Sequence, residues 1–203
     1  LVLIDLALAE LTEGRPARRA EIPADQRKAW RMLQLLTSKP VLYIANVDED
    51  SAGTGNAHSQ RVVDYAAEQG SDAVVISAKI ESELALLEAD ERAEYLDAIG
   101  LEEAGLDRLI HAGYNLLELQ TFFTVGPKEA RAWTFKHGWT APRCAGVIHG
   151  DFEKGFIKAE TIAYEDYVAH NGEAGAREAG KLRQEGKDYL VKDGDVLHFK
   201  FNV

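Results

Sequence analysis

The 203-residue sequence predicts an α/β part with parallel strands, followed by a separate and smaller α+β domain. Two apolar segments, at 41–46 and 71–79, flank an amphipathic helical pattern, which is typical of a parallel strand–helix–strand unit. From Leu119 onward the pattern changes to short strands around a helix, which is typical of an α+β domain. The two parts also differ in charge, because residues 1–117 carry 11 Lys+Arg and 21 Asp+Glu, whereas residues 118–203 carry 12 and 13.

The α/β part is expected to begin and end with helices. Apolar spacing predicts a helix over 1–13 and a second over 24–38, with Trp30, Leu33 and Leu36 on the inner face of the second. Pro40 then begins an apolar strand of the kind buried in parallel sheets. Gly70 is expected to end the helix between the two strands, since glycine suits the left-handed cap position. Residues 81–117 are expected to be helical.

The second part alternates strands with short helices. We expect strands at 119–125, 129–135 and 155–162, and helices at 141–149 and 164–170. The closing segment KDGDVLHFKFNV predicts a turn and an alternating strand. In that strand Leu197, Phe199, Phe201 and Val203 share one face, and His198, Lys200 and Asn202 share the other.

Composition excludes several classes of protein. One cysteine excludes an intramolecular disulfide framework, and no apolar run reaches the ~18 residues that a membrane span needs. The first residues, LVLIDLALAEL, lack a basic leader, so no signal peptide is expected and the protein is predicted to be cytoplasmic. A net charge of −11 argues against a nucleic-acid-binding surface over the whole molecule, and leaves the second part as the one that can offer RNA a basic face.

Polar residues follow both predicted parallel strands. Asn46-Val47-Asp48-Glu49 ends the first strand, and Ser77-Ala78-Lys79 ends the second. Ligands bind beyond the carboxyl ends of strands in open parallel sheets. An Asn amide offers a donor and an acceptor to a purine edge, and backbone N–H groups at Ser77-Ala78 can donate to a base carbonyl or to water. The alternative is that Asn46 is an ordinary turn residue.

These residues resemble a known family. Asn46-Val47-Asp48-Glu49 resembles the NxxE base-recognition loop of the Obg-like ATPases, the YchF family of P-loop NTPases, and Ser77-Ala78-Lys79 resembles the base-contact loop that follows it. The resemblance covers about residues 30–203 and is strongest from LLELQTFFTVGPKEARAWTF to the end of the sequence. It implies a partial parallel-sheet P-loop NTPase domain with a helical segment, followed by a TGS domain of β-grasp fold that contacts RNA or the ribosome.

The NxxE loop also bears on which base is bound. Ordinary GTPases use NKxD, whose aspartate accepts two hydrogen bonds from guanine. Glu49 is one methylene longer and cannot hold that geometry without displacement, and Val47 replaces the lysine. A site that loses its fit to particular hydrogen-bonding groups loses discrimination for them. We therefore expect ATP over GTP, as the resemblance also implies, with Asn46, Val47, Glu49, Ser77 and Ala78 forming the nucleotide-binding set.

The sequence departs from the family in two ways. It contains no GxxxxGK[ST], so it supplies neither the phosphate loop nor the Mg²⁺ ligands, and the DxxG at 97–100 is a chance match in a helical stretch. LVLIDL resembles the entry to the family's coiled-coil hairpin and LAELTEGRPAR its return, which places a join near Leu6–Ala7. We expect that the hairpin is deleted there or absent from this sequence.

The division expected from the resemblance has three parts: a helical remnant of the hairpin region at 1–38, the C-terminal part of the nucleotide-binding domain at 39–117, and the TGS domain at 118–203. The expected function is binding and hydrolysis of ATP, or of GTP, with Mg²⁺ by the full-length protein, while this chain alone is inactive and holds no catalytic residue. The alternative is a non-catalytic RNA- or protein-binding TGS module on an α/β scaffold.

The remaining candidates have simple structural interpretations. The six histidines lack ligand-type spacing, and HGDFE at 149–153 is expected to be a polar turn before a strand rather than a metal site. Cys144 is expected to pack in a core. Trp133 and Trp139 fit a core better than a base-stacking surface. An RNA-facing surface and a solvated face of mixed charge are equally compatible with the basic residues of the second part, which are Lys128, Arg131, Lys136, Arg143, Lys154 and Lys158.

Overall fold

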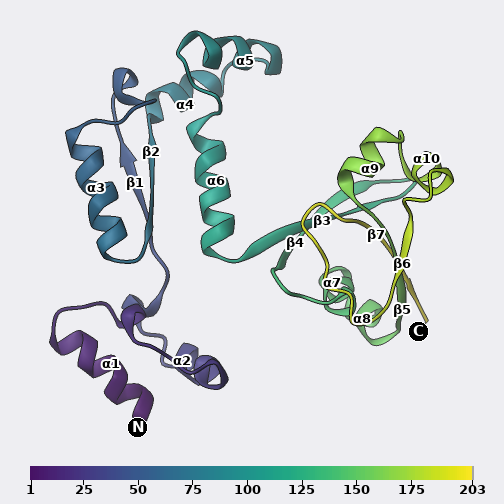
Figure 1. The fold of residues 1–203 in the computed structure, drawn as a ribbon, viewed down its shortest axis with the longest axis horizontal. Helices are drawn as coiled ribbons and strands as arrows, with labels where there is room; N and C mark the ends of the chain where they lie inside the picture. The colour runs from purple at the N-terminus through teal and green to yellow at the C-terminus, as the bar shows by residue number, and fades with distance from the viewer. Residues whose placement is uncertain (203) are drawn as a thin grey trace. The chain divides into compact units, whose positions relative to one another are not determined.

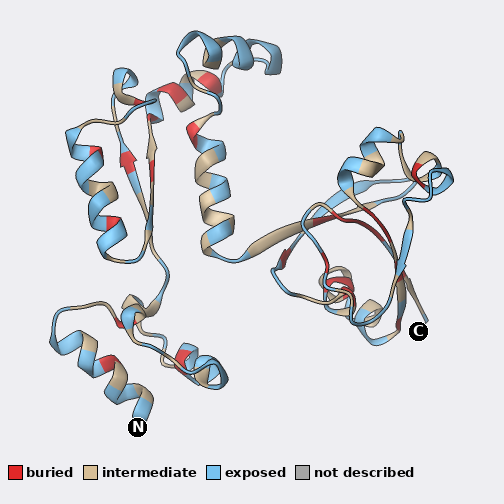
Figure 2. Cartoon of the chain, viewed as in Figure 1, coloured by how far each residue is buried: buried red, intermediate tan, exposed pale blue. Residues whose placement is uncertain are grey.

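The chain forms two compact units in a computed structural model that describes residues 1–202. The first unit is Leu1–Leu116, and the second begins at Leu117. Together they make a mixed α/β fold with one parallel and one mixed sheet. Each unit has buried clusters of its own, whose residues are coloured red in Figure 2.

The first unit opens with short helices around Trp30. They are α1 Val2–Thr12, η1 Ala17–Arg19, η2 Ala24–Gln26, α2 Arg27–Met32 and η3 Leu36–Ser38. The predicted first helix is confirmed, and it runs without a break through Leu6–Ala7, with Ala7 buried against the Trp30 cluster. The predicted helix over 24–38 is confirmed only in part, because α2 ends at Met32. Its backbone turns left-handed at Gln34 (φ +50°), which ends the helix, and Leu36 is 78% exposed instead of facing inward.

The predicted strand–helix–strand unit is confirmed. It consists of β1 Leu42–Asn46, η4 Glu49–Ser51, α3 Ala57–Glu68 and β2 Asp72–Ile76. The two strands are parallel, with Asn46 opposite Ile76. Gly70 (φ +63°) ends α3 as predicted: its N–H donates to the Ala67 carbonyl and the Ser71 N–H donates to the Ala66 carbonyl, which together form a Schellman motif. Ile44 is 50% exposed, because this sheet has two strands within the described residues, so the expected full burial of the first strand is wrong.

Three helices complete the first unit, where the sequence predicted helical structure over 81–117. They are α4 Ala78–Leu84, α5 Ala89–Ala98 and α6 Gly105–Leu116. Ile80 and Leu84 of α4 are buried together with Ala52. Figure 1 shows α3 and α6 on opposite sides of the β1–β2 pair, and both helices contact β2.

The second unit is a five-stranded sheet with helices. Its strands are β3 Leu119–Val125, β4 Ala130–Lys136, β5 Phe156–Ile162, β6 Arg183–Glu185 and β7 Val196–Phe201, in the order β4-β3-β7-β5-β6. Its helices are α7 Ala141–Ile148, α8 Gly150–Lys154, α9 Tyr164–Ala169 and α10 Glu173–Glu178. β3 and β7 are parallel and the other neighbouring strands are antiparallel. The elements missed from the sequence are α8, α10 and β6.

The core of the second unit follows the predicted alternation. Leu197 and Phe199 of β7 are buried, while His198 between them is exposed; the placement of Val203 lies outside the described residues. Phe122, Phe135 and Cys144 are also buried, and Trp133 and Trp139 pack against the same cluster. The expected turn at 149–153 is wrong in part, because this segment forms α8, whose first turn is capped by the His149 ring accepting from the Asp151 N–H at 3.2 Å.

Candidate functional site: the loops after β1 and β2

The residues predicted to read a base come together where β1 and β2 end. The pairing of Asn46 with Ile76 fixes the register of the two strand ends. The Val47 N–H then donates to the Ile76 carbonyl at 2.8 Å, which extends the pairing one residue beyond β1. The two loops therefore start side by side, although Asn46 and Ser77 are 31 positions apart in the sequence.

A side-chain hydrogen bond joins the two loops. The Asn46 Oδ1 atom accepts from the Ala78 N–H at 2.9 Å. Within residues 1–202 no hydrogen bond engages the Asn46 amide N–H₂ group, which leaves it able to donate. The Ala78 N–H, which was predicted to donate to a base, already donates to Asn46.

Glu49 is held by a cation from the second loop. Its Oε1 atom lies 2.5 Å from the Lys79 Nζ atom, and both side chains are largely exposed. The hydrogen bond from Lys79 to Glu49, followed by their Coulombic attraction, raises the pKa of Lys79 above its ordinary value of 10.5. Glu49 begins η4, and the Asp48 carboxylate caps this turn by accepting from the Ser51 N–H at 3.0 Å.

Ser77 is buried where the second loop meets α4. It is only 2% exposed, it immediately precedes α4, and its hydroxyl oxygen has no hydrogen-bond partner within the described residues. The candidate site thus consists of Asn46, Val47 and Glu49 from one loop with Ser77 and Ala78 from the other. Sequence reasoning missed the pairing role of Lys79, although its place directly after Ser77-Ala78 put it within the predicted loop.

The basic residues proposed to face RNA lie in the second unit. Five of the six are exposed, and Lys158 is half-buried with its Nζ atom donating to Gln184 Oε1 at 3.0 Å. Two of them stack on tryptophans, since the guanidinium carbon of Arg131 lies 4.0 Å from the Trp133 ring centroid and that of Arg143 lies 4.0 Å from the Trp139 ring centroid. None of the six forms a salt bridge in the part of the chain that the structure describes.

Among residues 1–202 no group of three or more His, Cys, Asp or Glu side chains is placed to hold a metal ion. Across the same residues, none of the helices combines the length and the apolar character that crossing a membrane requires.

The chain is similar to known proteins along its whole length. The family model YchF-GTPase_C, described as a protein of unknown function (DUF933), matches residues 119–202. The chain is 55% identical over 191 residues to a ribosome-binding ATPase YchF of Bacillus subtilis, covering 93% of this chain and 52% of that protein. It is 50% identical over 203 residues to the protein of the same name in Escherichia coli O157:H7, covering 100% of this chain and 56% of that protein.

A solved structure supports the same relationship. The YchF GTPase of Schizosaccharomyces pombe superposes with a TM-score of 0.85 at 32% sequence identity, over 98% of this chain and 53% of that one. The chain therefore spans just over half the length of the relatives it matches.

The fold and the paired loops define a two-unit protein in which a parallel α/β segment precedes a mixed-sheet α+β domain. Together with the matches along its full length, this architecture places the chain in a single family. The chain belongs to the YchF family.

Proposed function

We propose that the full-length protein is a P-loop NTPase that binds and hydrolyses ATP, and that this chain supplies the loops that read the base. The hydrogen bond from Ala78 N–H to Asn46 Oδ1 carries this proposal, because it locks two separate loops into one surface at the carboxyl ends of parallel strands. The relatives named ribosome-binding ATPase support the reaction class. The proposed domains are a helical segment at 1–38, the end of the nucleotide-binding domain at 39–117 and a β-grasp TGS domain at 118–203.

The contacts favour adenine over guanine. Guanine presents a carbonyl at the position where adenine carries an amine, so guanine needs a donor there. The Ala78 N–H is the natural donor, but Asn46 already occupies it. Glu49 is likewise paired with Lys79, so its carboxylate would have to leave that cation to accept from the N–H groups of guanine. The amide N–H₂ group of Asn46 is left to donate to a ring nitrogen that both purines share.

The phosphates and Mg²⁺ need residues that this sequence does not contain. No GxxxxGK[ST] occurs in it, and no metal-ligating cluster is formed by residues 1–202. The residues present thus fit the base and not the phosphate–metal group. Turnover of ATP by the 203-residue chain alone would contradict the proposal.

A titration of the full-length protein with ATP and GTP tests the base preference. We expect tighter binding of ATP, and we expect Asn46→Ala to weaken both nucleotides, because it removes the bond that joins the loops. Asn115→Ala, on the exposed surface of α6, is the matched control and should bind like the parent protein. A clear preference for GTP would overturn the assignment to ATP.

The second unit is proposed to contact RNA or the ribosome in the cytoplasm. Arg131 and Arg143 support this role, because both stack on tryptophans and neither forms a salt bridge within residues 1–202. Replacing Lys128, Arg131 and Lys136 together by Gln should weaken binding to ribosomes and reduce its salt dependence by up to about three charges' worth of slope. Unchanged binding across a salt series would contradict an electrostatic contact at these residues.

The competing function is a non-catalytic module that binds RNA or protein. The six basic residues of the second unit that form no salt bridge within residues 1–202 are compatible with it as well. Nucleotide binding separates the two proposals: if the full-length protein binds neither ATP nor GTP while it still binds ribosomes, the module is the better description.

A further inference from the structure

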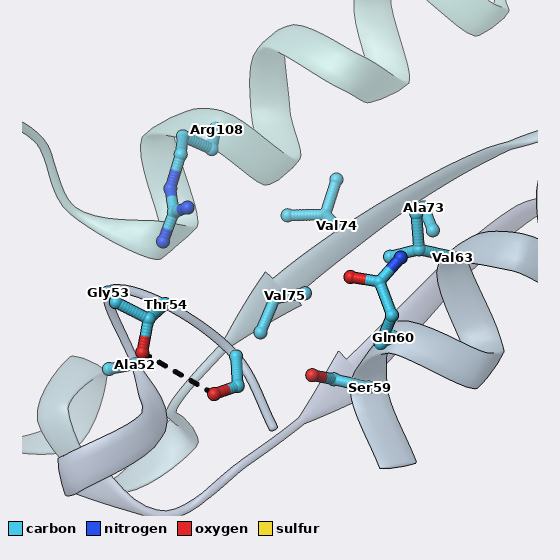
Figure 3. Close-up of a pocket in the computed structure, with 11 residues that line it drawn as sticks. Ala52, Gly53, Thr54, Ser59, Gln60, Val63, Ala73, Val74, Val75 and Arg108 are labelled. Atoms are coloured by element: carbon cyan, nitrogen blue, oxygen red, sulfur yellow. Dashed lines mark hydrogen bonds between the residues drawn. The ribbon is translucent and has the colours of Figure 1, made fainter. Parts of the chain in front are cut away.

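The outer edge of β2 borders a cavity of mixed polar and apolar lining that the proposed function does not use. The cavity has a volume of about 300 Å³, and β2 forms one wall of it through Ala73, Val74 and Val75. The loop after η4 and the first turns of α3 form the opposite side, and Arg108 reaches in from α6, as Figure 3 shows. All of these elements belong to the first unit.

The strand edge in this cavity presents unused backbone groups. The Ile76 carbonyl points toward β1, because it accepts from the Val47 N–H. The N–H and C=O groups of successive residues in a strand point alternately to its two sides. Those of Val74 therefore also point toward β1, whereas those of Ala73 and Val75 point away from it. Within residues 1–202, β2 pairs with β1 alone, and the outward groups of Ala73 and Val75 have no hydrogen-bond partner. The cavity therefore lies against an open parallel edge.

Arg108 adds a positive charge at one end of that edge. Its Nε atom is shielded from solvent without a hydrogen-bond partner, and its guanidinium forms no salt bridge within the described residues. Arg108 lies one turn after Gly105, which packs against the Ile76 side chain, so the guanidinium is at the carboxyl end of β2. Thr54 also lines the cavity, and its hydroxyl makes only a 3.5 Å contact with the Gly55 carbonyl.

A half-buried guanidinium without an acidic partner within residues 1–202 is matched best by a carboxylate, which it can bind through two parallel hydrogen bonds. An open strand edge is matched by an extended peptide. A peptide that adds in parallel to β2 ends at the same end of the sheet as β2 does, and Arg108 lies at that end. Small apolar side chains on the peptide suit the remaining lining of the cavity, which includes Val63 and Val74.

We infer that this groove binds the C-terminal carboxylate of an extended peptide, which pairs in parallel with the free edge of β2 and places its terminal carboxylate on Arg108. The backbone of Ala73 and Val75 supplies the main-chain hydrogen bonds, and Thr54 donates a further one to the carboxylate. This site is distinct from the base-reading loops, which Asn46 and Ala78 join at the carboxyl ends of β1 and β2.

The test uses the peptide acetyl-Ala-Val-Ala-Val as a free acid and as its C-terminal amide. Each is titrated into the 203-residue chain while backbone amide resonances are followed by NMR. We expect the free acid to shift the resonances of Ala73, Val75 and Thr54, and the amide form to bind at least about tenfold more weakly, since a charge-assisted hydrogen bond is lost.

Two variants test whether Arg108 is the residue that binds the peptide carboxylate. Arg108→Gln should weaken the free acid by about tenfold or more and bring its affinity near that of the amide. Arg61→Gln removes the same charge from the exposed surface of α3, outside the groove, and should leave binding unchanged. Because the acid–amide comparison uses the unaltered chain, the test does not depend on the folding of either variant.

Three results would overturn the inference. They are equal binding of the acid and amide peptides, the absence of shifts at Ala73 and Val75, and a response to acetate or inorganic phosphate alone that matches the peptide in affinity and in shifted residues. The last result would show an anion site that does not use the strand edge.

Discussion

At the scale of single residues, Asn46 organises the base-reading loops. Its Oδ1 atom binds the second loop through Ala78, and its amide N–H₂ group stays available. Sequence reasoning identified Asn46 and Glu49 from their place after an apolar strand. It did not identify the partner of either side chain, because those partners come from a loop that begins 31 positions later.

Glu49→Asp in the full-length protein is expected to shift nucleotide preference toward guanine. The shorter side chain reaches Lys79 less well, and its carboxylate regains the two-bond geometry that suits guanine. We expect the ratio of ATP affinity to GTP affinity to fall by about tenfold, as measured by calorimetric titration. Glu94→Asp, exposed on α5, is the matched control. A preference that does not move would refute the role given to Glu49.

Cys144 is expected to be unreactive in the folded protein. Burial raises the pKa of its thiol from 9.0 to about 12, and the side chain is fully buried. At pH 8 an aromatic disulfide reagent should therefore react more than about a hundredfold more slowly with the native chain than with the chain in urea. Equal rates in the two states would contradict the buried position.

The same shift gives a direction for stability against pH. The raised pKa means that folding favours the neutral thiol, so this contribution to the free energy of unfolding is complete below pH 9.0 and is lost as the pH rises toward about 12. Cys144→Ala should remove this loss in the alkaline limb of a urea-unfolding series, while the neutral limb keeps its slope. An unchanged alkaline limb would show that Cys144 does not cause the loss.

At the scale of elements, the helix between the two parallel strands depends on its first turn. The Asn56 side chain accepts from the His58 and Ser59 N–H groups at 3.0 Å each, and the Ser59 hydroxyl accepts from the Asn56 N–H at 2.8 Å. This reciprocal capping box fixes where α3 begins. Because α3 sets the crossover from β1 to β2, the cap also fixes the loop that borders the groove.

Asn56→Ala is expected to lower the free energy of unfolding of the first unit by about 1 kcal/mol, since it leaves two helix N–H groups without a partner. Urea unfolding followed by circular dichroism measures this change. Asn115→Ala, an exposed position within α6, is the control and should be neutral or slightly stabilising, because alanine has the higher helix propensity. If both variants change stability alike, the cap does not have the role given to it.

Element types were predicted better than element limits. The alternating strands β3, β4 and β7 and the capped helix α3 were predicted because their patterns are local. The end of the helix predicted over 24–38 was missed, because it depends on the left-handed backbone at Gln34, a residue type with no strong preference for that conformation. The three residues of β6 carry too short a pattern to be seen in the sequence and exist through pairing with β5.

At the scale of the whole molecule, the two units differ in how much core they contain. The second unit buries ten apolar residues in one cluster that includes Phe122, Phe135 and Phe199. The clusters around Trp30 and Ile80 in the first unit each contain three buried residues, and its sheet has two strands. Two-stranded sheets are marginal without further packing, so the first unit is expected to be the less stable one.

Unfolding is therefore expected in two steps. Trp30 reports on the first unit, and Trp133 and Trp139 report on the second. In urea, the fluorescence of a Trp133→Phe, Trp139→Phe double variant should change at lower denaturant than that of Trp30→Phe. Coincident transitions for the two variants would show instead that the units unfold as one body.

The sequence by itself determined the order of the elements, the parallel strand pair, the alternating strands of the second unit and the polar residues that end β1 and β2. Each of these depends on residue types within a few positions of one another, so a local pattern can encode it. Only the tertiary structure decided that Ala78 donates to Asn46, that Lys79 pairs with Glu49, and that the Arg108 Nε atom, at the open edge of β2, has no hydrogen-bond partner within residues 1–202. The first two of these features join residues about 30 positions apart, and the third depends on how α6 packs on the sheet, so no local pattern encodes them.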